Sequence, residues 1–157
     1  MTLLMTLLAI AVMVVVDQVV KYWAVTVLAP VGSIPLIPGV LQLSYVENRG
    51  AAFSILQNQI WLLLVITVVI LAIIIYSLHR KYIQTMLGKI SLVVIAAGAV
   101  GNMIDRIFRH FVVDMIQTTF IDFPVFNIAD IYVTVGVVLF VIYMLFQHRD
   151  TDAEDKK

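Results

Sequence analysis

The chain has 157 residues, of which 62% are hydrophobic and 13% charged, with a formal net charge of zero and a mean hydropathy of +1.06. Soluble domains are about half apolar and about a quarter charged, so this composition predicts one integral membrane domain spanning residues 1–157, and the neutral charge gives no indication of nucleic acid binding. The absence of cysteine excludes disulfides, and three histidines far apart in sequence (His79, His110 and His148) argue against a metal site.

Four segments are apolar over the roughly 20 residues that a membrane-spanning helix needs. They are residues 4–25, 59–78, 86–107 and 125–147. The first has no basic residue ahead of its apolar run, and no cleavage site with small residues follows it, so we expect a retained helix rather than a signal peptide. Gly98 and Gly101 in the third segment predict close helix packing through small residues.

The connection between the second and third spans indicates the orientation. Residues 79–89 contain Arg80, Lys81 and Lys89 and no acid. Because cytoplasmic loops are enriched in lysine and arginine, we expect this connection and both termini to be cytoplasmic. The outer side then receives residues 26–58 and 108–124.

The first outer segment, residues 26–58, is not helical in character. It holds Pro30, Pro35 and Pro38, and its stretch "LQLSYVEN" alternates apolar and polar residues apart from Val46, which predicts a half-buried strand. We expect a small sheet on the outer membrane surface, with its apolar face toward lipid headgroups or a lipidic ligand. The predicted fold class is therefore an all-α membrane protein, with four transmembrane helices and a small extracytoplasmic β-sheet.

The acidic residues of the spans are predicted to lie at one depth. Asp17 is about 16 residues along the first span, roughly 24 Å from its inner end at a rise of about 1.5 Å per residue. Asp105 ends the third span, and Asp130 begins the fourth. All of them should therefore lie near the outer surface, and ionisable residues within membrane spans usually mark function.

Each acid also has a simpler explanation. Asp17 and Lys21 are four residues apart, so they can neutralise each other on one helix face. Asn127 can cap the fourth helix, with Asp130 in the first turn, where an acid favours the helix dipole.

Asp105 is harder to explain in this way, because the dipole disfavours an acid at the end of a helix. We expect a structural clamp between Asp105, Arg106 and Asn102, because their i, i+3 and i+4 spacing places them on one face of the third span. Asp114 interrupts a short apolar run in the second outer segment, and an isolated loop aspartate is usually solvated.

Two carboxylates at a partly dry interface support a specific chemistry. Like charges about 3 Å apart cannot both ionise, so the pair shares one proton. The ionised acid can then draw a proton from water while the protonated acid binds the scissile carbonyl, which is aspartyl proteolysis. The same acids can relay protons in a small transporter, and a structural membrane subunit is a third possibility. The residues alone do not choose between them.

Five short motifs, in this order and spacing around four spans, resemble the bacterial lipoprotein signal peptidases (signal peptidase II). The motifs are "DQVVKYW" (17–23), "ENRGAAFSI" (47–55), "GNMIDR" (101–106), "VVDM" (112–115) and "FNIAD" (126–130). The resemblance implies an intramembrane aspartyl endopeptidase of the bacterial plasma membrane. It would remove the signal peptide from prolipoproteins on the amino side of a diacylglyceryl-modified cysteine. It implies that the enzyme needs no cofactor. The implied partners are membrane lipid and lipid-modified prolipoproteins, and the implied oligomeric state is a monomer.

The resemblance assigns the catalytic roles to Asp114 and Asp130. For Asp114 this replaces the interpretation as a solvated loop residue. It assigns supporting roles to Asp17, Lys21, Asn48, Gly50, Asn102, Asp105, Arg106, Asn127 and Ala129. We expect Asn48 to hydrogen-bond the substrate backbone. We also expect Gly50 and Ala51 to permit close backbone approach where "ENRGAAF" re-enters the membrane.

Overall fold

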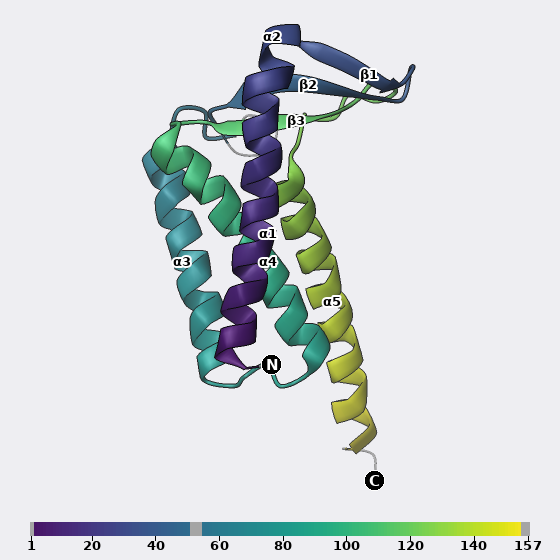
Figure 1. Cartoon of the computed structure of the whole chain (residues 1–157). Helices are drawn as coiled ribbons and strands as arrows, with labels where there is room; N and C mark the ends of the chain where they lie inside the picture. Colours follow the sequence, from purple (N-terminus) through teal and green to yellow (C-terminus); the bar gives the residue numbers. More distant parts are fainter. Residues whose placement is uncertain (1, 51–54, 155–157) are drawn as a thin grey trace.

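The computed structural model, which describes residues 2–50 and 55–154, is a bundle of four long helices with a three-stranded sheet at one end (Figure 1). In chain order the elements are α1 (Leu3–Trp23), a π-helical turn η1 (Ala24–Leu28), α2 (Ala29–Val31), β1 (Ser33–Ile37), β2 (Leu41–Asn48), α3 (Ile60–His79), α4 (Met86–Phe108), β3 (Val112–Thr118) and α5 (Ile128–Glu154). Each of the four long helices is long and apolar enough to cross a membrane, so the predicted fold class is confirmed.

Helix α4 is the centre of the bundle. Helices α1, α3 and α5 all pack against it, and half of its apolar stretch is buried, compared with 6% for the helix that begins at Leu3. The outward faces of the other helices carry exposed aliphatic side chains, for example Leu8, Val65 and Val138. An apolar surface of this extent on spanning helices is typical of contact with lipid.

Small residues let α4 approach its neighbours, as the sequence predicts. A Cβ atom on Gly98 would collide with the carbonyl oxygen of Ala129 on α5 and would lie 2.8 Å from Val133 Cγ2. A Cβ atom on Gly101 would lie 2.6 Å from a carboxylate oxygen of Asp17 on α1. Both glycines are therefore required by close contact rather than by backbone conformation.

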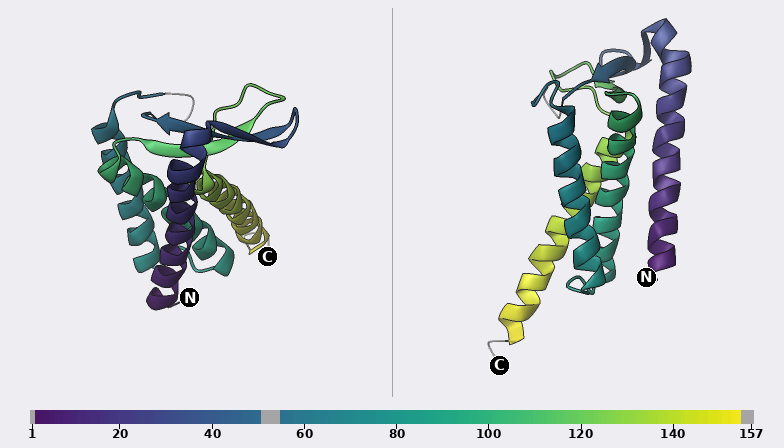
Figure 2. Two further views of the ribbon diagram at one scale, coloured as in Figure 1. Left: turned by 45° about the horizontal axis from the view of Figure 1, so that its top comes forward. Right: turned by 90° about the vertical axis from the view of Figure 1, so that its left-hand side faces the viewer.

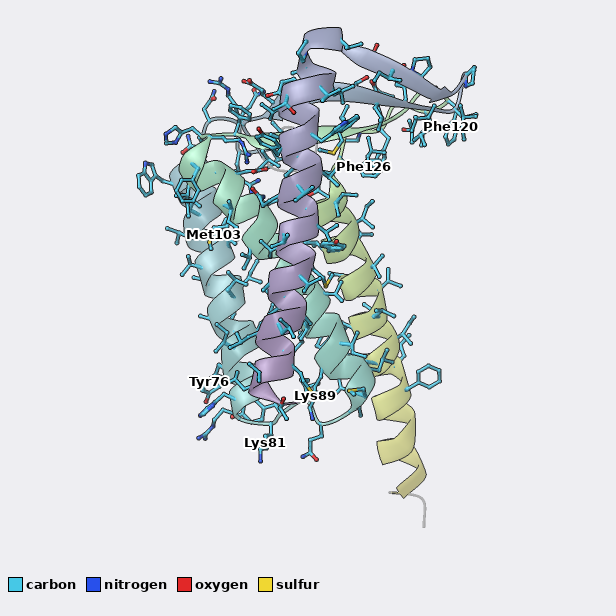
Figure 3. All side chains as sticks on the ribbon, in the orientation of Figure 1. Tyr76, Lys81, Lys89, Met103, Phe120 and Phe126 are labelled. Carbon is cyan, nitrogen blue, oxygen red and sulfur yellow. The ribbon has the colours of Figure 1, made fainter. Side chains whose placement is uncertain are left out.

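The two ends of the bundle differ in character. Lys81 and Lys89 lie at the end opposite the sheet, whereas Phe120 and Phe126 lie at the sheet end (Figure 3). The start of α1 and the far end of α5 also lie at the end that holds these lysines (Figures 1 and 2). The acid-free connection, the start of α1 and the far end of α5 thus lie at one end of the bundle, and the sheet lies at the other.

The sheet has the order β1-β2-β3 with antiparallel pairing, and it contains a β-bulge. Leu43 pairs with Ile116 and Val46 pairs with Asp114, so β2 uses one more residue than β3 over this interval. A bulge of this kind resets the alternation of faces. It explains why Val46 breaks the pattern of "LQLSYVEN".

The outer segment predicted from residue 26 onward begins instead as helix, and this boundary was wrong. Pro30 lies in α2, close to the end of the helical stretch that runs from Leu3 to Val31, and the π-helical turn precedes it. The Thr26 hydroxyl donates to the carbonyl oxygen of Tyr22 at 2.9 Å. Ala24 and Leu28 are fully buried, so packing beneath the sheet continues the helix past the sequence signal.

Two apolar residues of β2, whose face was predicted to contact lipid headgroups or a lipidic ligand, pack against the protein itself. Leu43 and Tyr45 pack against a buried cluster of Ala24, Leu28, Val113 and Met115. The sheet therefore closes over the end of the first helix, and burial of this cluster attaches it there.

The second outer segment, predicted as an irregular connection, contains strand β3. Val112, Val113, Asp114 and Met115 are all buried, so this strand lacks the period-two alternation of a half-exposed strand. A strand covered on both faces cannot be recognised from alternation.

Gly98→Val should destabilise the bundle, because the branched side chain has no space against α5 and overpacking costs about 1–3 kcal/mol or more. Thermal unfolding in detergent measures the effect. Ala72→Val, on the exposed face of α3, adds the same kind of bulk toward lipid and is the matched control, expected to keep the wild-type melting temperature. Equal melting temperatures for both variants would contradict the close contact at Gly98.

Candidate active site

A backbone bridge brings β3 and the start of α5 together. The amide of Ile116 donates to the carbonyl oxygen of Phe126 at 2.8 Å, and the amide of Phe126 donates back to Ile116 at 3.0 Å. Asp114 lies two residues before this bridge, and Asn127 directly follows it. The pairing therefore fixes the position of Asp114 relative to the first turn of α5.

Asn127 and Asp130 cap α5 reciprocally. The side-chain oxygen of Asn127 accepts from the amide of Asp130 at 3.0 Å, and Asp130 Oδ2 accepts from the amide of Asn127 at 3.1 Å. This arrangement has the pattern of a capping box and confirms the predicted helix cap. The same Asn127 also donates from Nδ2 to Asp114 Oδ1 at 2.6 Å, so it contacts both carboxyl groups.

A second amide binds each carboxyl group. Asn48 Nδ2 donates to Asp114 Oδ2 at 2.9 Å, and Asn102 Nδ2 donates to Asp130 Oδ1 at 2.8 Å. The Oδ1 atom of Asn48 accepts from the amide of Gly50 at 2.9 Å. The side chain of Asn48 is therefore bound to Asp114 and to its own chain, and its hydrogen bond to the substrate backbone stays a prediction. The predicted close approach at Ala51 lies outside the described residues.

Asp114 is buried, with 1% of its surface exposed, so its reading as a solvated loop residue is wrong. Burial, together with the charge of Asp130, raises the pKa of the Asp114 carboxyl to about 7, although the hydrogen bonds from Asn127 and Asn48 oppose the shift. At neutral pH this carboxyl therefore holds a proton for a substantial fraction of the time.

Lys21 lies in the centre of a second polar group, fully buried between α1 and α4. Its ammonium nitrogen is 3.0 Å from Asp17 Oδ2, 2.9 Å from Asp105 Oδ2 and 2.8 Å from Asn102 Oδ1. The predicted pairing of Asp17 with Lys21 is confirmed, but it is one part of a larger network. We call Asp17, Gln18, Lys21, Asp105 and Arg109 the charge cluster.

The predicted clamp between Asp105 and Arg106 is wrong in its partners. Asp105 forms ion pairs with Lys21 and with Arg109, and it accepts from the amide of Val113 at 3.2 Å. Arg106 instead donates to the carbonyl oxygen of Gly50 at 3.0 Å. Adjacent helical residues point in different directions, whereas Asp105 and Arg109 lie four apart on one face.

Two members of the charge cluster, Gln18 and Arg109, were missed. Gln18 donates to Asp17 Oδ2 and to the carbonyl oxygen of Gly101, each at 3.1 Å, and accepts from Arg109 at 3.3 Å. The spacing of four residues gave a usable signal for Arg109. No signal existed for Gln18, because its distant partners, Gly101 and Arg109, come from another part of the chain.

Ala129 connects the charge cluster to α5. Its backbone amide donates to Asp17 Oδ1 at 3.0 Å, and the residue is fully buried. Asp17 therefore binds groups from α1 and α5 at once, and it lies against Gly101 of α4. All eleven residues singled out from the sequence belong to this connected polar region, at the sheet end of the bundle.

Two cavities open at the site. A groove of about 590 Å³ between α3, α4 and α5 is mainly apolar and includes Asp130 in its wall. A more polar pocket of about 450 Å³ beside the sheet includes Asp114. Asn48, Pro124 and Val125 line both. The two carboxyl groups thus face adjoining cavities of different character.

The side chains offer acid–base chemistry by carboxyl groups. Among the side chains that the structure describes, those of residues 2–50 and 55–146, no three histidine or acidic side chains are grouped as metal ligands. Two carboxyl groups that share the donor Asn127, one of them with a raised pKa, form a pair suited to proton transfer.

Comparison with known proteins identifies relatives along nearly the whole chain. The family model for signal peptidase (SPase) II matches residues 9–146. The chain is 44% identical over 128 residues to the lipoprotein signal peptidase of Streptococcus thermophilus (strain CNRZ 1066), covering 82% of this chain and 84% of the relative. It is also 44% identical over 135 residues to that of Streptococcus pyogenes serotype M5 (strain Manfredo), covering 86% and 89%.

Solved structures of membrane enzymes are also similar to this chain over nearly its whole length. One bacterial membrane enzyme, determined in meso at 2.3 Å resolution, superposes with a TM-score of 0.84 at 34% identity, covering 99% of this chain and 93% of that chain. A second, at 1.9 Å, superposes with a TM-score of 0.82 at 34% identity, covering 91% and 94%.

Asp105→Asn should lower the free energy of unfolding by about 3 kcal/mol, because it removes one partner of a buried ion pair. The groups left with less compensation are Lys21 and Arg109, rather than the Arg106 that the sequence suggested. Thermal unfolding measures the effect. Glu47→Gln breaks the exposed pair with Arg49 and is the control, with an expected change below about 1 kcal/mol. An unchanged melting temperature together with lost activity would instead assign Asp105 to the chemistry.

Proposed function

The chain belongs to the signal peptidase II family, and we propose that Asp114 and Asp130 are the catalytic aspartates with which it removes signal peptides from prolipoproteins. As a member of this family it is a peptidase, and its four spanning helices make it a multi-pass membrane protein. We further propose that the sheet end faces the outside, with both termini cytoplasmic, and that cleavage is on the amino side of a diacylglyceryl-modified cysteine.

The observation that carries the proposal is the double contact of Asn127. Its side chain donates to Asp114 at 2.6 Å, and its backbone amide donates to Asp130 at 3.1 Å. A single residue therefore holds two carboxyl groups from β3 and α5 near one another. The influence of Asp130 on the pKa of Asp114 supports the same conclusion, because like charges at short range favour one shared proton.

The charges around the pair also favour one proton. Among the buried and half-buried side chains of the site, the acids are Asp17, Asp105, Asp114 and Asp130, and the cations near them are Lys21, Arg106 and Arg109. Four carboxylates against three cations leave one negative charge in excess, and one shared proton removes it. Uncompensated charge in a dry interior is costly, so this balance stabilises the singly protonated pair.

In the proposed reaction, the ionised Asp130 takes a proton from a water molecule while the oxygen of that water attacks the scissile carbonyl carbon. The protonated Asp114 gives its proton to the carbonyl oxygen, which forms a tetrahedral diol. When the diol collapses, the C–N bond breaks, Asp130 gives its proton to the leaving nitrogen, and Asp114 takes a proton back from a diol hydroxyl. The products are a signal peptide with a new carboxylate and a lipoprotein with a new ammonium group, and both aspartates return to their starting states, so atoms and charge balance.

The adjoining cavities suit a substrate with an apolar helix on one side of the scissile bond. The groove between α3, α4 and α5 is lined mainly by apolar side chains and is suited to the signal segment. The polar pocket beside the sheet is suited to the chain that follows the scissile bond. A peptide that passes from one cavity to the other would lie between Asp130 and Asp114.

The alternative of a small proton-coupled transporter is not supported. The family match and the related lipoprotein signal peptidases indicate a peptidase, and the related structures are membrane enzymes. Asp17, Asp105, Asp114 and Asp130 also gather at the sheet end of the bundle, whereas transport sites lie near the membrane midplane.

Asp114→Asn and Asp130→Asn should each lower kcat by roughly 100-fold to 10,000-fold while the protein stays folded, because asparagine keeps the shape but not the proton chemistry. Cleavage of a lipid-modified prolipoprotein, followed by mobility on gels, measures turnover, and thermal unfolding checks the fold. Asp152→Asn, near the far end of α5, is the control with the same chemical change. Wild-type turnover by either dyad variant would sink the assignment.

The pH dependence of turnover tests the proton on Asp114. Raising the pH removes this proton, and the raised pKa of about 7 places the loss near neutrality rather than near pH 4. We therefore expect kcat/KM to decline above about pH 7. A profile that stays flat to pH 9, measured where thermal unfolding shows an intact fold, would contradict a catalytic proton on Asp114.

A further inference from the structure

Lys21 does not contact either carboxyl group of the proposed catalytic pair, yet it contacts an amide that does. We propose that Lys21 is a positioning residue for the reaction: its ammonium fixes the Asn102 amide so that Asn102 donates to Asp130, which makes Asp130 the ionised partner and leaves the shared proton on Asp114. This inference rests on the proposed function and adds the physical cause of the division of roles between the two aspartates.

The orientation of Asn102 follows from the chemistry of its neighbours. An ammonium group only donates hydrogen bonds, so the side-chain atom of Asn102 at 2.8 Å from Lys21 Nζ must be the carbonyl oxygen. The amide nitrogen then faces Asp130, at 2.8 Å from Oδ1. A flipped amide would place N–H groups against the ammonium and an oxygen against the carboxylate, and both contacts would be repulsive.

The orientation continues through Asn127. The oxygen of Asn127 accepts from the amide of Asp130, so its nitrogen must supply the donors. One donor goes to Asn102 Oδ1 at 3.2 Å and the other to Asp114 Oδ1 at 2.6 Å. Each amide in this chain therefore has one allowed orientation, and the ammonium of Lys21 sets the first of them.

The two carboxyl groups are treated unequally by this network. Asp130, in the first turn of α5, accepts from Asn102, whose carbonyl is polarised by the ammonium, and from the backbone amide of Asn127, which caps that helix. Polarised donors and a helix N-terminus both favour negative charge. Asp114 accepts from two neutral side-chain amides, those of Asn48 and Asn127, and lies on a buried strand. Negative charge is thus better stabilised on Asp130.

The charged groups that face the pair come from four elements. Lys21 approaches from α1, Arg106 from α4, and each aspartate faces the other from β3 or α5. The residues of α3 that line the groove, Thr67 and Ile70, carry no charge. Removal of Lys21 therefore changes the protonation of the pair in a way that Arg106 does not compensate, because Arg106 is directed to the carbonyl oxygen of Gly50.

The test compares Asp17→Asn/Lys21→Met with Asp17→Asn alone. The double variant removes one acid and one cation, so it has the same total charge as the wild-type protein. Asp105 retains its ion pair with Arg109. Asp17→Asn keeps Lys21 on Asn102 and provides the reference values. We expect kcat of the double variant to fall by about 10-fold to 100-fold below the reference, with KM little changed, since a misplacement of about 1 Å costs on that order.

The readout specific to positioning is the acid limb of the kcat/KM profile. A carboxylate that loses an ordered donor takes up a proton more readily, so we expect the acid limb to move to higher pH by about one unit. A role of Lys21 limited to stability would lower the melting temperature and leave this limb in place. An unmoved limb would overturn the proposal.

A double-mutant cycle tests whether Lys21 acts through Asn102. Asn102→Ala should itself move the acid limb to higher pH, and replacing Lys21 in that background should move it no further. Additive shifts would overturn the relay. If the Lys21 variants do not fold, Asn102→Ala alone decides, because an unchanged acid limb in that variant contradicts the proposal.

Asp114→Asn, assayed beside these variants, separates the two levels of inference. Full turnover in Asp114→Asn contradicts the proposed function and the relay that rests on it. Lost turnover there, combined with an unmoved acid limb in the Lys21 and Asn102 variants, contradicts the relay alone.

Discussion

A buried ammonium group, that of Lys21, is the constraint on which the polar end of this bundle depends. A charge with no exposure must be compensated within the protein, and here Asp17, Asp105 and Asn102 supply the oxygens. These contacts hold α1 against α4, while Asp17 also accepts from the backbone of α5. In lipid, apolar contacts give little preference for one helix arrangement, so polar contacts and small residues decide it.

The sheet supplies the part of the candidate site that the helices lack. Its third strand carries Asp114, and the bridge from Ile116 to Phe126 fixes that strand to the start of α5. The bulge in β2 ends at Val46, which pairs with Asp114, and bulges are common beside functional sites. The cluster of Ala24, Leu28, Val113 and Met115 attaches the sheet to the end of the first helix. The candidate dyad is thus assembled from a strand and a helix, each held by a separate interaction.

The proposed chemistry needs an asymmetric pair of acids at a boundary between an apolar and a polar space. Asp130 borders the groove between the helices, and Asp114 borders the polar pocket beside the sheet. Asn127 contacts both acids, and Asn102 connects one of them to the charge cluster. Structural stability and the division of roles between the aspartates are therefore served by the same network, which explains why so many polar residues gather at one end of an apolar chain.

The sequence by itself determined the features that depend on local spacing and composition. The four spans followed from apolar runs of sufficient length, the gathering of acids at one end from the direction of each span, and the pair of Asp17 with Lys21 from a separation of four residues. The close approach at Gly98 and Gly101 followed from residue size. The pairing of Asp114 with Asp130 was different, because it came from resemblance to a family and not from any pattern in the residues.

Only the tertiary structure decided which groups meet across elements. Strand β3 was hidden because both of its faces are buried, which removes the alternation that marks a strand. Asp105 was assigned to Arg106, but its partners are Lys21 on another helix and Arg109 one turn further on. Helix spacing restricts the neighbours within one helix and gives no information about a second helix. The site forms where α1, α4, β3 and α5 meet, so its hydrogen-bond directions exist only once those four elements are packed together.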